Sequence, residues 1–217
     1  MKKTTLIEWL IALFSLAPFV YLAAIWNTLP DQVPVHFNFE GQADRYSGKG
    51  ELLIPLVFVC LLPWVLMRFL PSIDPKGKLQ ENPASLRNIR LIIAAFMGVL
   101  GVVIVNSASN NGAHIGALLP AIISALFMGL GNYMINVKPN YFIGIRTPWT
   151  LEDEDVWRKT HRIGGRMMFF GGLASLALSL LLPVKLAFAA FMILTMGAAL
   201  IPVVLSYVYY RQKKAAA

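Results

Sequence analysis

Six long apolar blocks constrain this chain more than any other feature of its sequence. They cover residues 6–26, 52–70, 89–106, 113–137, 167–182 and 186–210. A helix needs about 17–25 residues to cross a hydrocarbon core of about 30 Å, and the blocks are close to that length. They lack the alternation of barrel strands, so helices are the spanning structure that satisfies the backbone in lipid. We therefore predict an all-α integral membrane protein with six transmembrane helices, whose constant partner is the lipid bilayer.

The positions of the basic residues predict the orientation of these helices. Sixteen of the nineteen Lys and Arg residues lie at the amino terminus, in or beside the second and fourth connections, or in the tail. Cytoplasmic ends of membrane helices carry this excess of positive charge, so both termini are predicted to be cytoplasmic. The net charge of +8 is then a signal of topology, and no direct nucleic-acid partner is predicted.

The connections between the blocks divide the chain into three parts. Residues 1–70 form an amino-terminal two-helix unit with an external loop at 27–51. Residues 71–137 supply a cytoplasmic linker and the third and fourth helices, and residues 138–217 a carboxy-terminal region with a polar cytoplasmic segment and the last two helices.

The external loop contains a short alternating pattern. Apolar and polar residues alternate over residues 33–39, which predicts a strand-like segment between the first two helices, and Gly41 would turn the chain. His36 and Glu40 would lie about 13 Å apart on such a strand, too far to share a metal ion, so no metal site is predicted. His36 is also a candidate sensor of external pH. The candidate site residues here are Pro34, His36, Asn38, Gly41 and Asp44.

The longest polar segment, residues 140–165, precedes the fifth block. Thr150 is a suitable N-cap with Asp153 three residues later, which predicts an amphipathic cytoplasmic helix before the fifth transmembrane helix. Arg146 lies close to a Gly and a Pro and is expected to pair with an acidic residue, stack on a tryptophan or bind lipid phosphate. The candidate site residues here are Asn140, Gly144, Arg146, Thr147, Pro148, Trp149, Trp157, Arg158, Thr160, His161 and Gly164.

Absent patterns narrow the class of function. No ionisable residue lies at the middle of a block, which disfavours pumps and proton-coupled carriers. No phosphate loop, zinc motif or nucleophile motif is present, so neither enzymatic activity nor a cofactor is predicted. A transporter or lipid-handling protein remains the alternative, and its polar path would be formed by Ser124, Asn132, Asn136 and Thr195.

Two segments resemble the SdpI family of bacterial membrane proteins. Residues 29–38 with Gly41, Asp44 and Gly48 resemble the family's amino-terminal domain of unknown function, and residues 144–150 with Asn140, Trp157, Thr160, His161 and Gly164 resemble its carboxy-terminal region. The resemblance implies an immunity protein of the bacterial inner membrane. Such a protein protects the cell from a secreted membrane-active toxin peptide and sequesters a transcriptional repressor on the cytoplasmic side. The oligomeric state is not predicted.

Overall fold

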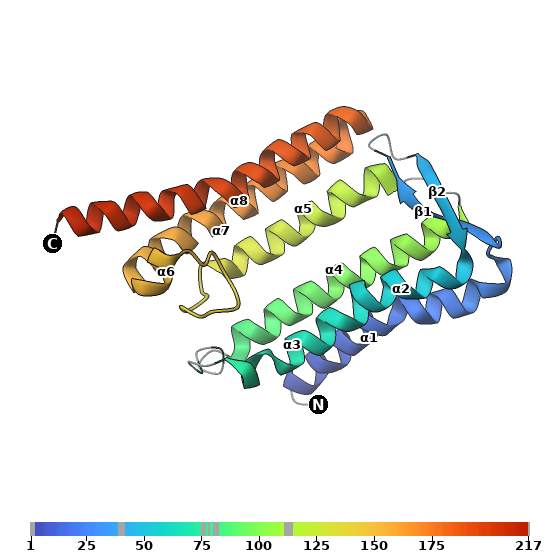
Figure 1. Cartoon of the computed structure of the whole chain (residues 1–217), viewed down its shortest axis with the longest axis horizontal. Helices are drawn as coiled ribbons and strands as arrows, with labels where there is room; N and C mark the ends of the chain where they lie inside the picture. The colour runs from blue at the N-terminus through green and yellow to red at the C-terminus, as the bar shows by residue number, and fades with distance from the viewer. Residues whose placement is uncertain are drawn as a thin grey trace.

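A computed structural model of the chain describes residues 3–38, 42–74, 77, 79, 83–110 and 115–216 (Figure 1). Its helices are α1 (Lys3–Ile25), α2 (Leu53–Leu56), α3 (Leu62–Ile73), α4 (Pro83–Ser109), α5 (Ile115–Met134), α6 (Pro148–Glu152), α7 (Glu154–Leu181) and α8 (Val184–Ala215). Shorter helical turns are η1 (Trp26–Thr28), η2 (Lys49–Leu52) and η3 (Val57–Leu61), and the strands are β1 (Gln32–Phe37) and β2 (Ala43–Gly48). The predicted turn at Gly41 lies outside the described residues.

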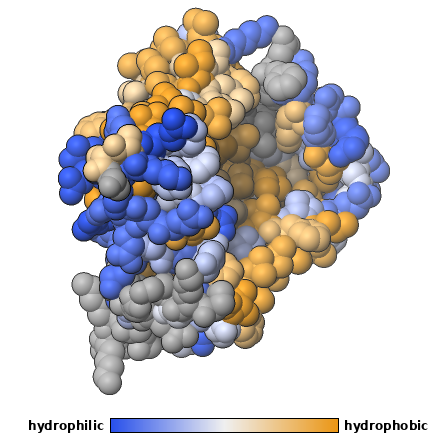
Figure 2. Space-filling model, turned by 60° about the vertical axis from the view of Figure 1, so that its left-hand side comes forward, coloured by the Kyte–Doolittle hydropathy of each residue, from blue (hydrophilic) through white to orange (hydrophobic). Residues whose placement is uncertain are grey.

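Five described segments are long and apolar enough to cross a membrane: Leu6–Thr28, Lys49–Ile73, Pro83–Ser109, Glu154–Leu181 and Val184–Ala215. A sixth apolar helix, Leu118–Met134, is shorter, and Figure 1 shows α5 running alongside α4 and α7. Large apolar side chains such as Phe170 and Ile193 point outward, with 63% and 73% of their surface exposed. Figure 2 shows hydrophobic surface between two hydrophilic patches, and hydrophobic residues also line the hollow that this face contains. The prediction of an all-α, multi-pass membrane protein is confirmed at this level.

The helices form two groups. α5, α7 and α8 pack together, while α1, the α2–η3–α3 segment and α4 form the other group, and α4 also contacts α5. The backbones of α5 and α7 touch where both carry small residues. A Cβ placed on Gly131 would lie 2.6 Å from the carbonyl oxygen of Gly165, so no larger residue fits there. Such close backbone approach is how helices gain packing energy in lipid.

An ion pair ties α1 to α4 inside the first group. Both terminal nitrogens of Arg90 donate to the Glu8 carboxylate, at 2.9 and 3.0 Å. The Arg90 side chain is only 10% exposed, while that of Glu8 is 35% exposed. Two parallel N–H···O bonds fix the direction of both side chains, so this pair also fixes the register of the two helices.

The second membrane segment widens into a π-helical turn at η3. Pro63, two residues beyond it, has no N–H to donate to the carbonyl of Val59, and a widened turn accommodates such a missing bond. Cys60 in this turn is buried, and its thiol donates to the carbonyl of Met97 on α4 at 3.3 Å.

The loop that is predicted to be external folds into a β-hairpin. β1 confirms the predicted extended segment, and β2, which pairs with it antiparallel, was not expected from the sequence. The pairing register shifts between Pro34 and His36 and again between His36 and Phe37. The neighbours Val33 and Pro34 are both buried, so the predicted strict alternation is wrong. The hairpin packs onto the helix ends through a cluster of Leu29, Val33, Leu52, Leu56 and Val105.

The predicted amphipathic helix is not a separate element. α7 is one continuous helix from Glu154 to Leu181, and only the five-residue α6 precedes it. Thr147 caps α6 and Asp153 caps α7, so the prediction of Thr150 as the N-cap is wrong. Pro148 starts α6 just after Thr147, since proline is favoured in the first helical turn. Figure 1 shows the start of α1 and the end of α8 far from the β-hairpin, at the end of the helices that carries α6.

Candidate functional site

Most of the predicted cytoplasmic site residues meet in one cluster, which we call the clasp. The clasp comprises residues 137–150, the facing turns of α7 that carry Trp157, His161 and Gly164, and Ser206 of α8. It holds an irregular segment against α7 and α8, and the hydrogen bonds of its polar side chains are described in turn below.

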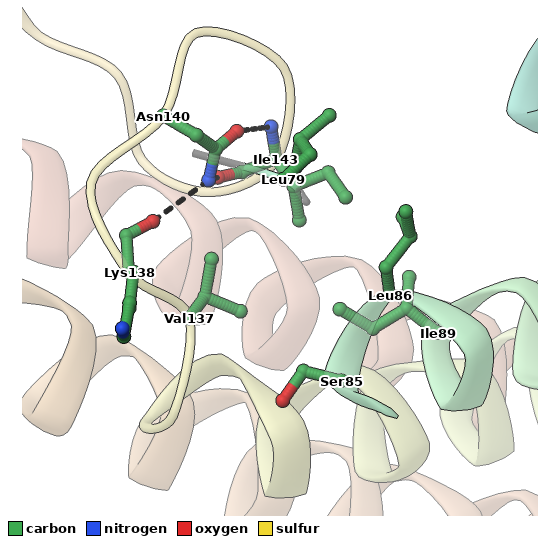
Figure 3. Close-up of a pocket in the computed structure, with 8 residues that line it drawn as sticks. All are labelled: Leu79, Ser85, Leu86, Ile89, Val137, Lys138, Asn140 and Ile143. Atoms are coloured by element: carbon green, nitrogen blue, oxygen red, sulfur yellow. Dashed lines mark hydrogen bonds between the residues drawn. The ribbon is translucent and has the colours of Figure 1, made fainter. Parts of the chain in front are cut away.

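Asn140 shapes the first turn of the clasp. Its side-chain amide donates to the carbonyls of Lys138 and Ile143 at 2.8 and 3.0 Å. Its side-chain oxygen accepts the N–H groups of Phe142 and Ile143 at 2.8 and 2.7 Å. Figure 3 shows this side chain lying inside the loop that it closes. Asn140 is only 3% exposed. A substitution that removes its hydrogen bonds would therefore leave buried backbone groups unpaired.

His161 and Trp157 hold the middle of the clasp. The backbone N–H of Ile145 donates to His161 Nε2 at 3.0 Å, and His161 Nδ1 lies 2.9 Å from the carbonyl oxygen of Trp157. These two contacts require a neutral ring with its proton on Nδ1. The indole N–H of Trp157 donates to the carbonyl of Val137 at 2.7 Å. Both rings are 1% exposed, so His161 is a structural residue here and not a free acid or base.

Two glycines allow the segment to approach α7. Gly144 has φ +119°, and a Cβ there would lie 2.3 Å from His161 Nε2. A Cβ on Gly164 would lie 2.7 Å from Cδ1 of Ile145. Thr160 is fully buried on the same helix, and its hydroxyl has no hydrogen-bond partner within the described parts of the chain.

The last turn of the clasp is attached to α8. The Thr147 and Thr150 side chains form a reciprocal capping box on α6, and the Thr150 hydroxyl also donates to the carbonyl of Ile145 at 2.8 Å. The indole N–H of Trp149 donates to the Ser206 hydroxyl, which also lies 3.3 Å from the Thr147 hydroxyl. Ser206 is fully buried and was missed from the sequence, although a polar residue inside an apolar block often bonds to another element.

Three of the predicted cytoplasmic site residues remain on the surface: Arg146, Pro148 and Arg158. Arg146 donates a hydrogen bond to the carbonyl of Tyr141. This partner is neither the acidic residue nor the tryptophan ring that the sequence suggested. Arg158 pairs with Asp155 and lines a groove of about 390 Å³. The groove also contains Glu154 and the 135–139 turn.

A second group of charges joins the start of α7 to the end of α8. Lys213 donates to Asp153 at 2.9 Å and to Asp155 at 2.8 Å. The hydrogen bond from Lys213 holds the pKa of Asp153 below its ordinary value. Burial opposes this effect, and hydrogen bonds from the backbone N–H groups of Val156 and Asp155 add to it. Lys213 was missed because its partners lie about 60 residues away in sequence.

The clasp also contacts the other helical group. Ile89 of α4, Val137 and Trp157 form one buried cluster. Beside it, a cavity of about 20 Å³ separates Leu86 and Ile89 of α4 from Val137 and Asn140, as Figure 3 shows. The clasp is therefore a place where both groups of helices meet.

The described site residues of the loop that is predicted to be external lie on or beside the β-hairpin. His36 Nδ1 and a carboxylate oxygen of Asp44 lie 2.6 Å apart on neighbouring strands, and both side chains are exposed. The Asn38 side-chain oxygen accepts the N–H of Gln42 at 3.0 Å. Pro34 is buried and Gly41 lies outside the described residues. The structure thus brings His36 and Asp44 together as a polar pair on the surface, a contact that the spacing along β1 did not suggest.

The residues expected to line a transport path are either hydrogen-bonded within the helices or exposed. Ser124 is buried, and its hydroxyl donates to Pro120 and to Ser175 of α7. The Thr195 hydroxyl donates to Phe191 on its own helix, while Asn132 and Asn136 are exposed. Within the described residues, no group of three or more His, Cys, Asp or Glu could hold a metal ion. The prediction that the chain is not an enzyme stays a prediction.

Comparisons with known proteins give one match near each end of the chain and one match over most of its length. The model of the SdpI/YfhL protein family matches residues 136–210, and that of a domain of unknown function, DUF1648, matches residues 13–60. The Immunity protein SdpI of Bacillus subtilis (strain 168) is 23% identical over 190 residues, which are 87% of this chain and 88% of that protein. No solved structure matches the chain. The resemblance to the SdpI family is confirmed.

Proposed function

We propose, from the likeness to the Immunity protein SdpI, that this chain is a membrane immunity protein that also transmits a signal. It protects a bacterial cell against a secreted membrane-active toxin peptide. It resides in the inner membrane, with both termini in the cytoplasm. The observation that carries the proposal is the extent of the likeness, which covers 87% of this chain and 88% of the relative. The SdpI/YfhL match over residues 136–210 also contains every residue of the clasp.

The external hairpin is the proposed contact for the toxin. His36 and Asp44 present a polar pair at the surface of a hairpin that is anchored by buried residues. A rigid platform with exposed polar groups suits recognition, because little conformational entropy is lost when it binds a peptide.

The cytoplasmic surface of the clasp is the proposed contact for a transcriptional repressor. Arg146 and Arg158 are exposed there, and Arg158 lines the groove of about 390 Å³ that also contains Glu154. Mixed charges at the rim of a groove favour a specific protein partner over a uniformly charged one. The buried clasp residues position this surface and are not expected to touch the partner.

Communication between the two faces would pass through the helices. A toxin shifts the protein between two arrangements only if it binds one of them more tightly. The cluster of Ile89, Val137 and Trp157 joins the clasp to α4, and Val105 of α4 contacts the hairpin cluster at the other end of that helix. We propose α4 as the connection.

The test is survival and membrane potential in a sensitive bacterial host during challenge with purified sporulation-delaying toxin peptide. The wild type should protect the host, and His36→Ala should reduce protection at equal membrane expression. Gln32→Ala, an exposed change at the start of the same strand, is the matched control and should protect fully. Arg146→Ala should keep protection if its role is confined to the cytoplasmic face. A wild type that gives no protection at normal expression would exclude the immunity role.

A further inference from the structure

A basic groove lies between α7 and α8, away from the clasp residues described above. It has a volume of about 290 Å³ and is lined by Lys159, Arg162, Ile163, Arg166, Tyr209 and Gln212. The three cations recur at helical spacing on α7, so they project from one side of that helix. No acidic residue belongs to this lining in the part of the chain that the structure describes.

Among the residues that the structure describes, none neutralises the cations of the basic groove. Within the described residues, Lys159, Arg162 and Arg166 make no ion pair and no hydrogen bond. The nearby carboxylates of Asp153 and Asp155 are already paired with Lys213 and Arg158. Three like charges around one cavity repel one another, and an anion placed between them would remove that repulsion.

The basic groove lies at the level where lipid headgroups are expected. Directly after Arg166, residues 167–181 of α7 carry no charge and would enter the hydrocarbon. Trp149 of α6 packs against Tyr207 and Tyr210 of α8, and its ring centroid lies 5.2 and 6.5 Å from theirs. These tyrosines are within one turn of Tyr209 and Gln212. Such aromatic groups mark the boundary between lipid and water.

We propose that the basic groove binds the phosphate group of an anionic phospholipid. The guanidinium groups of Arg162 and Arg166 donate paired hydrogen bonds to phosphate oxygens, and Lys159 adds a third positive charge. Tyr209 and Gln212 supply neutral hydrogen-bonding groups for the rest of the headgroup. Ile163 gives the groove an apolar wall for the first methylene groups of the chains. This site is independent of the immunity role, since it uses none of the residues assigned to the toxin or the repressor.

The test uses the purified full-length chain in neutral detergent, to which phosphatidylglycerol, phosphatidylcholine or inorganic phosphate is added. Phosphatidylglycerol should raise the midpoint of thermal unfolding, and phosphatidylcholine should not. The double variant Arg162→Gln, Arg166→Gln should bind phosphatidylglycerol at least about tenfold more weakly, because two basic contacts are lost. A shift of equal size with inorganic phosphate alone would assign the site to free phosphate and not to lipid.

The matched control is Arg211→Gln, Lys214→Gln, which removes two charges from the same end of α8 without touching the groove lining. It should retain the wild-type affinity for phosphatidylglycerol. An equal loss in the control would show unspecific attraction by net charge and overturn the proposal. The absence of any lipid-dependent shift in the wild type would overturn it as well. Displacement of phosphatidylglycerol by a polyglutamate peptide at lower concentration would instead assign the groove to an acidic protein.

Discussion

The ring of His161 stacks on the ring of Trp157, with centroids 3.9 Å apart and planes 17° apart. Each ring also bonds to the backbone of the clasp, Trp157 to the carbonyl of Val137 and His161 to the N–H of Ile145. One turn of α7 therefore holds the irregular segment at two points. The residue order of the polar segment 140–165 is thus explained mainly by the contacts that fold the clasp.

Replacing Trp157 by Phe should destabilise the protein by about 1–3 kcal/mol, because the carbonyl of Val137 loses a buried hydrogen bond. The midpoint of thermal unfolding of the purified protein measures this. Trp9→Phe is the control, since Trp9 is 66% exposed on the lipid-facing side of α1, and its effect should stay within about 0.5 kcal/mol. Equal midpoints for the two variants would argue against the clasp as a source of stability.

Gly144→Ala should destabilise by at least about 2 kcal/mol, through a strained φ and a clash with His161. Little folded protein is expected after solubilisation, as measured by size-exclusion chromatography. Gly50→Ala is the matched change, because a Cβ there meets nothing within 4 Å and the backbone is not strained. Similar yields of the two variants would contradict the close approach at Gly144.

The contact between Asp153 and Lys213 should weaken in acid. The folded-state pKa of Asp153 is lowered, first by the hydrogen bond from Lys213. A lowered carboxyl pKa adds stability that is present above the unfolded value of about 4 and is lost as the pH falls through the folded value. The midpoint of thermal unfolding of the wild type should therefore decrease as the pH is lowered from about 5 to about 3, the range in which carboxyl groups take up protons.

Asp153→Asn separates charge from capping in that experiment, because Asn is also a good N-cap. The variant should show a smaller fall of the midpoint over the same pH range. A fall identical to that of the wild type would mean that Asp153 does not contribute to the acid response.

The Glu8–Arg90 pair should show measurable coupling in a double-mutant cycle. With Arg90 only 10% exposed, the coupling energy between Glu8→Gln and Arg90→Gln is expected at about 1–3 kcal/mol. The Asp31–Lys49 pair provides the contrast, since Asp31 is 96% exposed and the coupling should be below about 1 kcal/mol. Chemical denaturation of the four variants of each cycle gives both values, and equal couplings would contradict the burial of the first pair.

The sequence predicted the membrane helices because length and apolar character are local properties of each block. It also predicted that a helix begins in this segment, with Thr150 as its N-cap. It misplaced the cap because two helices begin within seven residues, at Pro148 and Glu154. Both Thr147 and Asp153 are good capping residues, and the choice among such residues depends on which turn packs against α8.

The roles of individual site residues were harder to predict, because they depend on contacts between distant parts of the chain. Nothing near Trp149 in sequence indicates that its indole bonds to Ser206, 57 residues later. Histidine is a residue type that often has a functional role, but both ring nitrogens of His161 form hydrogen bonds within the clasp. Arg146 and Arg158 remain on the surface. Which residues of the segment are exposed and which are buried could be told only from the folded structure.

α7 is 28 residues long, which is about 42 Å at 1.5 Å per residue. The hydrocarbon core is only about 30 Å thick, so about 12 Å of this helix extends into the wet boundary of the membrane. The turn that carries Trp157 and His161 belongs to this protruding part. Water at that boundary would compete for the polar contacts of the segment if they were open to it, but Trp157 and His161 are each only 1% exposed. Exclusion of water by the two stacked rings is what makes those bonds stable, and the aromatic pair therefore acts as the seal of the structure.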